Sequence, residues 1–442
     1  MQKKTGIHFY INIANLDDVS EAEEKATNEV RHTIHALDTY FSAIEAYGKH
    51  HYHDAFIVEK ITGSRLHMYV VNDSIVKSFD IVSAVSRYAY ELIEYLNGEV
   101  PKYRTLIPFQ IQVGACYGHF YEFEFKRENA DELTTIGYAA NYAAKLQSFA
   151  PSLHICVSEN LYNALGSEQK RSFTRVESDT FKKYEQSCCY DSLLDHLICR
   201  YNFHRDLKRA SEIAARVNLQ EMTFRDANQP VSYEHLSKTE CKRLYGIPLF
   251  ADVRGFTEQF DADDSNLEEM AQKTQFILTA MYDIVERCNG IHVQFQGDRE
   301  MALFHDYHGY TCATDAVIAG LRIIDGVKPF QVNVGVGQSY GRLFASKIGV
   351  RGEKDNILIG RIVNEADRNE DEMANENQLV ISATIYKKLR AENPAVAGLF
   401  QKADDQTYYT ELGYQAFITR QEQKRLNQDN RQKNYNGAWR QY

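Results

Sequence analysis

Apolar and polar residues along the second half of this chain alternate in the manner of strands and helices. The segment at 249–258 opens on an apolar strand, and residues 267–288 carry apolar positions at helical spacing. Alternating residues then flank Gly297-Asp298, which predicts a β-hairpin with that pair at its turn. A further strand leads into a helix at 362–373. Because strands and helices alternate, we expect a sheet that is covered by helices on one face.

The same pattern is written twice. Five blocks recur in the same order at offsets between 221 and 240 residues, which chance similarity of short strands does not produce. The chain is therefore a diverged tandem duplication. The pairs are FYINIANLDD (9–18) with LFADVRGFTE (249–258), EKITGSRLHMYV (59–70) with VQFQGDREMALF (293–304), PFQIQVGACYGHF (108–120) with PFQVNVGVGQSYGRLF (329–344), TTIGYAANYAAK (134–145) with ILIGRIVNEADR (357–368), and ICVSENLYNAL (155–165) with VISATIYKKL (380–389).

The duplication divides the chain into four parts. We expect a first domain at 1–165, a structured connector at 166–240, a second domain at 241–395, and a C-terminal extension at 396–442. The connector carries many charges and one predicted helix, at 206–217. From about residue 418 the sequence is polar without an apolar period, so we expect a surface tail there.

Composition narrows the functional classes. The chain is 44% hydrophobic and 25% charged and has no apolar run of 18 residues, so we expect a soluble cytoplasmic protein without a membrane span. Its eight cysteines form no C-x-x-C pair, which favours free thiols in a reducing compartment. A net charge of −11 argues against nucleic acid as a partner. It does not argue against a nucleotide site, where a few local positive groups and a metal dominate the field.

Two carboxylates carry the strongest chemical signal. Asp252 ends an apolar strand, and Asp298 lies at the predicted hairpin turn. Two such groups at adjacent strand ends can hold two Mg²⁺ or Mn²⁺ ions against a triphosphate. The residues that follow the first of them, Gly255, Phe256 and Thr257, open a helix and offer backbone N–H groups to phosphate. Each aspartate alone is most simply a turn residue, whereas the two together predict a metal site.

The sequence motifs around these residues resemble those of a known family. F-x-D-h-R-G-F-T, then G-D-x-x-M-A-x-F, then G-x-x-V-N-x-x-x-R is similar to the catalytic domain of class III adenylate/guanylate cyclases. The resemblance covers 245–390 strongly and 7–165 weakly. It implies an α+β fold, with two tandem ferredoxin-like (βαββαβ) domains that form a pseudo-dimer with active sites at their interface. One partner of such a dimer supplies the metal carboxylates, and the other binds base, ribose and phosphate.

Compared residue by residue, the resemblance implies different roles for the two copies. In the second copy Asp252 and Asp298 match the metal ligands, with the Val253 carbonyl as a third contact. The first copy has Asn12 and Ser64 at those positions, so it is expected to be degenerate and unable to hold two metals.

The partner surface has two candidate forms. If the two copies dock on each other, the complete site uses Lys60 and Thr134 to read the base, with Asn141 and Lys145 at the ribose and transition state. Tethering in one chain favours this arrangement. A homodimer of second copies from separate chains is the alternative, and it would use Gln294, Ile357, Asn364 and Arg368 instead.

The base-reading pair bears on the substrate. Lys60 donates hydrogen bonds and Thr134 can accept one, which suits adenine or cytosine better than guanine or uracil. The QFQGDREMALF segment (294–304) and the tandem copies resemble the pyrimidine cyclases of bacterial antiphage Pycsar systems. That resemblance favours CTP, converted with two divalent metal ions to cyclic CMP and pyrophosphate. The product would be a second messenger read by a separate cyclic-nucleotide-binding effector. The alternatives are an adenylate or uridylate cyclase, or a catalytically inactive nucleotide-sensing module.

Overall fold

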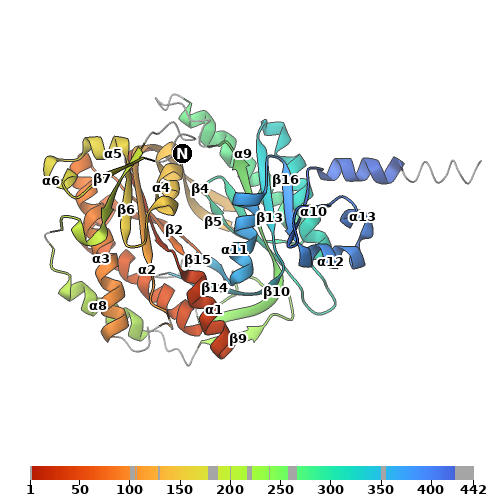
Figure 1. Cartoon of the computed structure of the whole chain (residues 1–442), viewed down its shortest axis with the longest axis horizontal. Helices are drawn as coiled ribbons and strands as arrows, with labels where there is room; N and C mark the ends of the chain where they lie inside the picture. The colour runs from red at the N-terminus through yellow and green to blue at the C-terminus, as the bar shows by residue number, and fades with distance from the viewer. Residues whose placement is uncertain are drawn as a thin grey trace, which may run out of the picture.

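The computed structural model contains two mixed sheets, one from each half of the chain, packed against each other (Figure 1). It describes residues 2–99, 105, 107–127, 130–177, 188–199, 201–216, 222–237, 239–256, 266–349 and 355–423. We call the part of the chain that forms the first sheet, whose strands lie within 2–193, the first half. The part that forms the second sheet, whose strands lie within 223–410, is the second half.

The first sheet has the strand order β2-β3-β1-β4-β6-β8-β7, with β5 paired to β4. Strands β1 and β4 pair antiparallel, as do β1 and β3, whereas β4 and β6 are parallel. The β2–β3–β1–β4 part has the ferredoxin-like order that the sequence predicts. The strands are β1 (Gln2–Ile13), β2 (Phe56–Thr62), β3 (Arg65–Val70), β4 (Ile111–Arg127), β5 (Ala130–Ile136), β6 (His154–Ser158), β7 (Thr174–Glu177) and β8 (Cys188–Leu193).

The second sheet repeats this arrangement in the order β11-β12-β10-β13-β16-β18-β17, with β14 paired to β10 and β15. The hairpin turns at Gly297-Asp298 as predicted, and Gly297 has φ +70, a conformation that glycine adopts without strain. The strands are β9 (Thr223–Asp226), β10 (Glu240–Arg254), β11 (Ile291–Gln296), β12 (Arg299–His305), β13 (Asn333–Gln338), β14 (Gly341–Ile348), β15 (Asp355–Ile359), β16 (Gln378–Ser382), β17 (Gln401–Lys402) and β18 (Thr407–Thr410).

Long helices flank the two sheets on the outside of the molecule. Figure 1 shows α2, α3 and α8 at one end and α10, α12 and α13 at the other, with α1, α4 and α11 between the halves. The helices are α1 (Leu16–Thr27), α2 (Arg31–Tyr52), α3 (Ile75–Glu99), α4 (Tyr138–Phe149), α5 (Glu159–Ala164), α6 (Ser167–Lys170), α8 (His204–Arg216), α9 (Leu267–Arg287), α10 (Ala313–Gly326), α11 (Arg361–Arg368), α12 (Ala383–Glu392) and α13 (Pro394–Ala397). None of the helices within the described ranges is both long and apolar enough to cross a bilayer.

Each half contributes a strand segment to the hydrophobic core of the other, and we call these segments, at the end of β4 and in β15, the β arms. Phe123 and Phe125 of β4 are buried in the core of the second half, and Phe125 meets Phe295 edge-on at 4.6 Å between ring centroids. In return, Ile357 of β15 is buried in the core of the first half. Because apolar surface is removed from water on both sides, the two halves stabilise each other.

Short strands lie in the two segments outside the predicted domains. The connector at 166–240 contains β7 and β8, which extend the first sheet, and β17 and β18 extend the second sheet within the predicted extension at 396–442. These strands have two to six residues, too few for a clear alternating pattern. The connector helix is confirmed as α8 (His204–Arg216). The tail from about 418 is helical over 414–423, and its remainder lies outside the described residues.

Candidate active site

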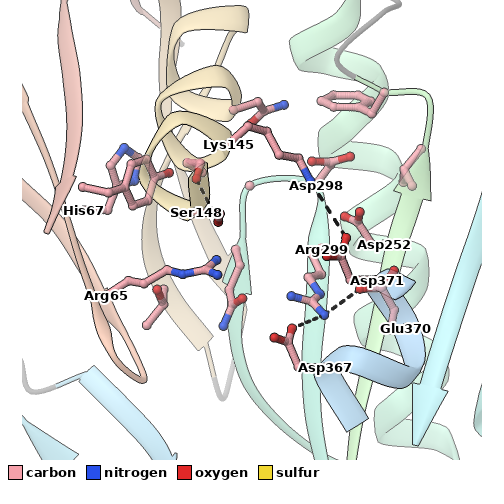
Figure 2. Close-up of a pocket in the computed structure, with 18 of the residues that line it drawn as sticks. Arg65, His67, Lys145, Ser148, Asp252, Asp298, Arg299, Asp367, Glu370 and Asp371 are labelled. Carbon is pink, nitrogen blue, oxygen red and sulfur yellow. Dashed lines mark hydrogen bonds and ion pairs between the residues drawn. The ribbon is translucent and has the colours of Figure 1, made fainter. Parts of the chain in front are cut away.

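A polar cavity with a volume of about 360 Å³ lies between the two halves. The second half lines it with the end of β10, the β11–β12 hairpin and the segment after α11. The first half lines it with β1, β2, β3 and α4. Figure 2 shows these two groups of side chains facing each other across the opening. The arrangement is the one expected of an interface site within a single chain.

Asp252 and Asp298 both face this cavity, at the end of β10 and at the hairpin turn (Figure 2). Asp298 is only 8% exposed. Burial raises the pKa of Asp298 well above its usual value, and the neighbouring Asp252 raises it further. Burial also raises the pKa of Asp252, although Arg299 and Lys145 oppose that shift. Two carboxylates of like charge therefore share one site, in which the Arg254 guanidinium lies 3.9 Å from Asp252.

Ion pairs of Arg254 and Arg299 lie next to the two aspartates. Arg299 pairs with Asp367 and lies 2.6 Å from the Glu370 carboxylate, while Arg254 lies 2.7 Å from the other oxygen of Glu370. Arg254 also donates to the Ala374 carbonyl at 3.0 Å. These bonds anchor a π turn, Asn369–Met373, that follows α11 within the predicted helix at 362–373. Such turns are frequent at functional sites, and this one brings Glu370 to the cavity.

The predicted phosphate-binding segment is described in part. Gly255 and Phe256 line the cavity next to Asp252, and Val253 lines it as well. Gly255 has φ +64, in the left-handed region that glycine tolerates. Thr257 lies outside the described residues.

From the first half, Asn141 and Lys145 of α4 reach the same cavity. A Cβ placed on Gly297 would come within 3.3 Å of Asn141 Oδ1, so this side chain lies directly against the hairpin tip. Lys145 lies 3.9 Å from Asp371 and lowers the pKa of both Asp252 and Asp298. The structure thus brings the predicted ribose and transition-state residues to the predicted metal residues.

The predicted base-reading pair is placed differently. Lys60 lines the cavity, but its ammonium donates to Glu132 at 3.3 Å, to Thr134 at 3.3 Å and to the Phe295 carbonyl at 3.1 Å. An ammonium has three N–H donors, so all of them meet protein acceptors. Thr134 is fully buried under Lys60 rather than at the cavity wall. The pair is close in space as predicted, yet it is engaged with the protein.

Several cavity residues were not singled out by the sequence motifs. Arg65 follows the degenerate Ser64 position and points into the cavity on the same side as His67 (Figure 2), and Tyr10 lines the cavity as well. The Tyr10 and His67 rings stack at 4.1 Å. The repeat could have identified Arg65, because it aligns with Arg299 of the second half.

A second, smaller cavity of about 270 Å³ occupies the symmetry-related position between the halves. Asn12 and Ser64 lie there, and Ser64 Oγ donates to Asn12 Oδ1 at 2.7 Å. A neutral amide and a hydroxyl that satisfy each other offer no anionic ligand for a hard cation. Asn364 also lines this second cavity.

The residues of the alternative two-chain site are not gathered at one surface. Gln294 and Ile357 are buried, 4% and 0% exposed, whereas Asn364 and Arg368 are exposed on α11. Ile357 packs into the core of the first half. A dimer of second halves would need this packing to separate.

A chain of buried polar groups lies beneath the Arg65 side of the cavity. His8 Nδ1 is 3.0 Å from His67 Nε2, and His67 Nδ1 is 3.0 Å from Glu59. Burial opposes it, but His67 and Lys60 lower the pKa of Glu59 to about 2. His8, Glu59 and His67 are close enough to hold a metal ion. Both ring nitrogens of His67 are already hydrogen-bonded in opposite directions, which favours a linear hydrogen-bonded chain over a chelate.

His292 connects this network to the second half. Its ring lies 2.8 Å from Glu300 and 2.9 Å from Glu132, the same carboxylate that Lys60 contacts. Burial would lower the pKa of His292, but Glu300 and Glu132 raise it to about 10. The imidazolium, Lys60 and the two glutamates therefore form a charged cluster across the interface.

This cluster predicts a dependence of stability on pH. Since the folded pKa of His292 exceeds its unfolded value near 6.5, its stabilising effect is present below pH 6.5 and is lost as pH rises to about 10. Relative to His292→Gln, the wild type should lose on the order of 3 kcal/mol of unfolding free energy across that window. Urea unfolding at several pH values measures the difference. Parallel pH curves for the two proteins would contradict it.

Comparisons with known proteins agree with the fold. No protein-family model matches the chain. A Pseudomonas aeruginosa protein named uridylate cyclase is 21% identical over 439 residues, covering 90% of this chain and 80% of that one. The solved structure of a class III adenylyl cyclase-like ATP-binding protein from Pseudomonas aeruginosa is 18% identical, with a TM-score of 0.68 over 94% of this chain and 90% of that one. The adenylyl cyclase CyaB from P. aeruginosa is 22% identical over 38% of this chain and 95% of its own, with a TM-score of 0.33.

The second of these matches spans both halves at once. The fold is thus the predicted α+β arrangement of two tandem class III cyclase domains, and the resemblance to the class III cyclases is confirmed.

Proposed function

We propose that this chain is a nucleotide cyclase with one active site, formed between its two halves. The observation that carries the proposal is the convergence of Asp252 and Asp298 with Asn141 and Lys145 at a single cavity. The carboxylates come from one half, and the amide and ammonium come from the other. The relative named uridylate cyclase and the class III cyclase fold support the same activity.

The residues present fit two divalent cations. Asp252 and Asp298 are hard oxygen ligands whose pKa values are raised chiefly by burial. Together with the Val253 carbonyl they would hold Mg²⁺ or Mn²⁺. Bound there, such ions would lower the pKa of the ribose 3′-hydroxyl and neutralise the triphosphate.

The side chains of this protein then position and stabilise the substrate. Asn141, held against the hairpin tip, would orient the ribose so that its 3′-oxygen lies in line with the α-phosphorus. Lys145 would stabilise charge that develops on the α-phosphoryl group while pyrophosphate leaves. Gly255 and Phe256 would place backbone N–H groups beside the phosphates.

The substrate is proposed to be a pyrimidine nucleoside triphosphate. In the sequence, the Lys60–Thr134 pair favours ATP or CTP over GTP or UTP, and the resemblance to the pyrimidine cyclases favours CTP. In the folded chain the donors of Lys60 are committed to Glu132, Thr134 and Phe295, so the pair favours CTP over UTP less strongly. The name of the relative favours UTP. The role of the product as a messenger in antiphage defence stays a prediction of the sequence resemblance.

A product assay tests the activity directly. The purified chain is incubated with Mn²⁺ and each of ATP, CTP, GTP and UTP separately, and cyclic nucleotide and pyrophosphate are measured. We expect cyclic CMP or cyclic UMP as the main product. Dominant cyclic AMP would overturn the pyrimidine assignment. Absence of pyrophosphate from all four would overturn the enzyme and favour the nucleotide-sensing module.

A Lys60 variant tests whether this residue is structural. Lys60→Met removes a buried cation and leaves Glu132, whose side chain is only 16% exposed, with one cation fewer, so we expect the free energy of unfolding to fall by about 3 kcal/mol. Urea denaturation measures this. The matched control is Lys49→Met, because that lysine is about half exposed and should change stability by less than about 0.5 kcal/mol. Unchanged stability together with lost base selectivity would instead make Lys60 the base-reading residue.

A further inference from the structure

Arg65 is a cation that the first half directs into the active-site cavity. It begins β3, and Figure 2 shows its side chain extending toward the centre of the cavity, on the opposite side from Asp252 and Asp298. Within the part of the chain that the structure describes, its guanidinium makes no hydrogen bond or ion pair. Burial opposes it, but Arg299 and then Arg65 lower the pKa of Asp367 in the second half. Arg65 therefore acts on this acid through its charge without a direct bond, and its N–H donors are available to a ligand.

The duplication explains why this arginine is available. Arg299 occupies the equivalent position of the second half, where Asp367 and Glu370 of that same half bind it. The first half has Ala144 and Gln147 at the positions of those two acids. Arg65 therefore has no acid of its own half at these positions and, unlike Arg299, makes no direct ion pair within the described residues.

Arg65 also lies where a base would reach. A triphosphate bound at Asp252, Asp298 and Lys145 occupies one side of the cavity, so the nucleoside extends toward the other side. There, Arg65 and His67 lie together in Figure 2, with Tyr10 stacked on His67 at 4.1 Å. The other cation on that side is Lys60, and its three N–H donors already meet acceptors of the protein.

We propose that Arg65 is the specificity-determining residue of this site and that it selects a base with a carbonyl oxygen, uracil over cytosine. The inference rests on the cyclase function proposed above and names its substrate. A guanidinium only donates hydrogen bonds, so it pairs with the O4 carbonyl of uracil. At the same position cytosine carries an amino group, which also donates, and the two donors would face each other unpaired.

The test compares base selectivity rather than total activity. We measure kcat/KM for UTP and for CTP in the wild type, in Arg65→Gln and in Arg65→Lys. The wild type should favour UTP, and Arg65→Gln should lower the UTP-to-CTP ratio by about 10- to 100-fold, mainly through KM, because it replaces a charged hydrogen bond with an amide that can also accept. Arg65→Lys should retain part of the preference. The matched control is Arg287→Gln, on the solvent face of α9, which should keep the wild-type ratio.

Binding separates this inference from the proposed activity. Calorimetric titration of UTP and CTP into the wild type and Arg65→Gln, with Ca²⁺ as the metal, needs no turnover. Tighter binding of UTP that is lost in Arg65→Gln supports the inference even if no cyclic nucleotide is ever formed. An unchanged UTP-to-CTP ratio in Arg65→Gln overturns it. An equal loss of both nucleotides also overturns it, because Arg65 would then bind the triphosphate.

Discussion

Asp298→Asn is expected to lower kcat by about a thousandfold or more with every nucleoside triphosphate. The substitution removes one of the two carboxylates that would hold the cations, and such ions supply several kcal/mol of transition-state stabilisation. Each 1.4 kcal/mol corresponds to a factor of ten in rate. Asp252→Asn should have an effect of the same size. Pyrophosphate release under saturating substrate and Mn²⁺ measures both.

The same substitution should stabilise the metal-free protein. Asp298 is buried beside a like charge, which raises its pKa and opposes folding at neutral pH. Removing that charge should raise the melting temperature measured without metal, while Mn²⁺ should no longer raise it further. Asp405→Asn is the control, because that aspartate is 96% exposed and should change neither property. Full turnover in either aspartate variant would end the cyclase interpretation.

Lys145→Met should lower kcat by about 10²- to 10³-fold, whereas Arg368→Met should change it by less than about twofold. Removing one preorganised group that stabilises developing charge has an effect of that size. Lys145 acts on the pKa of both aspartates, while Arg368 is exposed on α11 and does not line the cavity. Single-turnover rates at saturating substrate and metal provide the comparison.

These two variants also decide how the site is assembled. The two residues occupy equivalent positions of the repeat, so each serves as the control of the other. Loss of activity in Arg368→Met with normal activity in Lys145→Met would mean that two chains form the site. Mixing the inactive Asp298→Asn and Lys145→Met proteins gives an independent measurement. Recovered activity would show that residues from separate chains combine.

The sequence predicts the fold, and it identifies the two aspartates that the structure brings to one cavity, because the signals for both are local. Asp298 is part of a hairpin turn whose glycine and flanking alternation are contiguous in the chain, and Asp252 ends a single apolar strand. The repeat then supplies the partner surface with Asn141 and Lys145. The short strands β7 and β17 were not predicted, because two to four residues carry no measurable period.

The base-reading side depends on contacts between residues far apart in the chain. Lys60 donates hydrogen bonds to Glu132 and to the backbone carbonyl of Phe295, which is 235 positions away. No local sequence pattern predicts either bond. Arg65 illustrates a different limit. The alignment of the copies matches it to Arg299. That Ala144 and Gln147 replace two acids becomes meaningful only once the structure shows that Asp367 and Glu370 pair with Arg299.

The exchanged β arms bear on the evolution of this chain. Since Phe125 fills the core of the second half and Ile357 fills that of the first, deleting either copy would leave the survivor with an open apolar surface. The copy with Asn12 and Ser64 could lose the two acids that the other copy keeps, yet it could not be discarded. After the duplication, the exchange of these segments made each copy dependent on the other for its hydrophobic core.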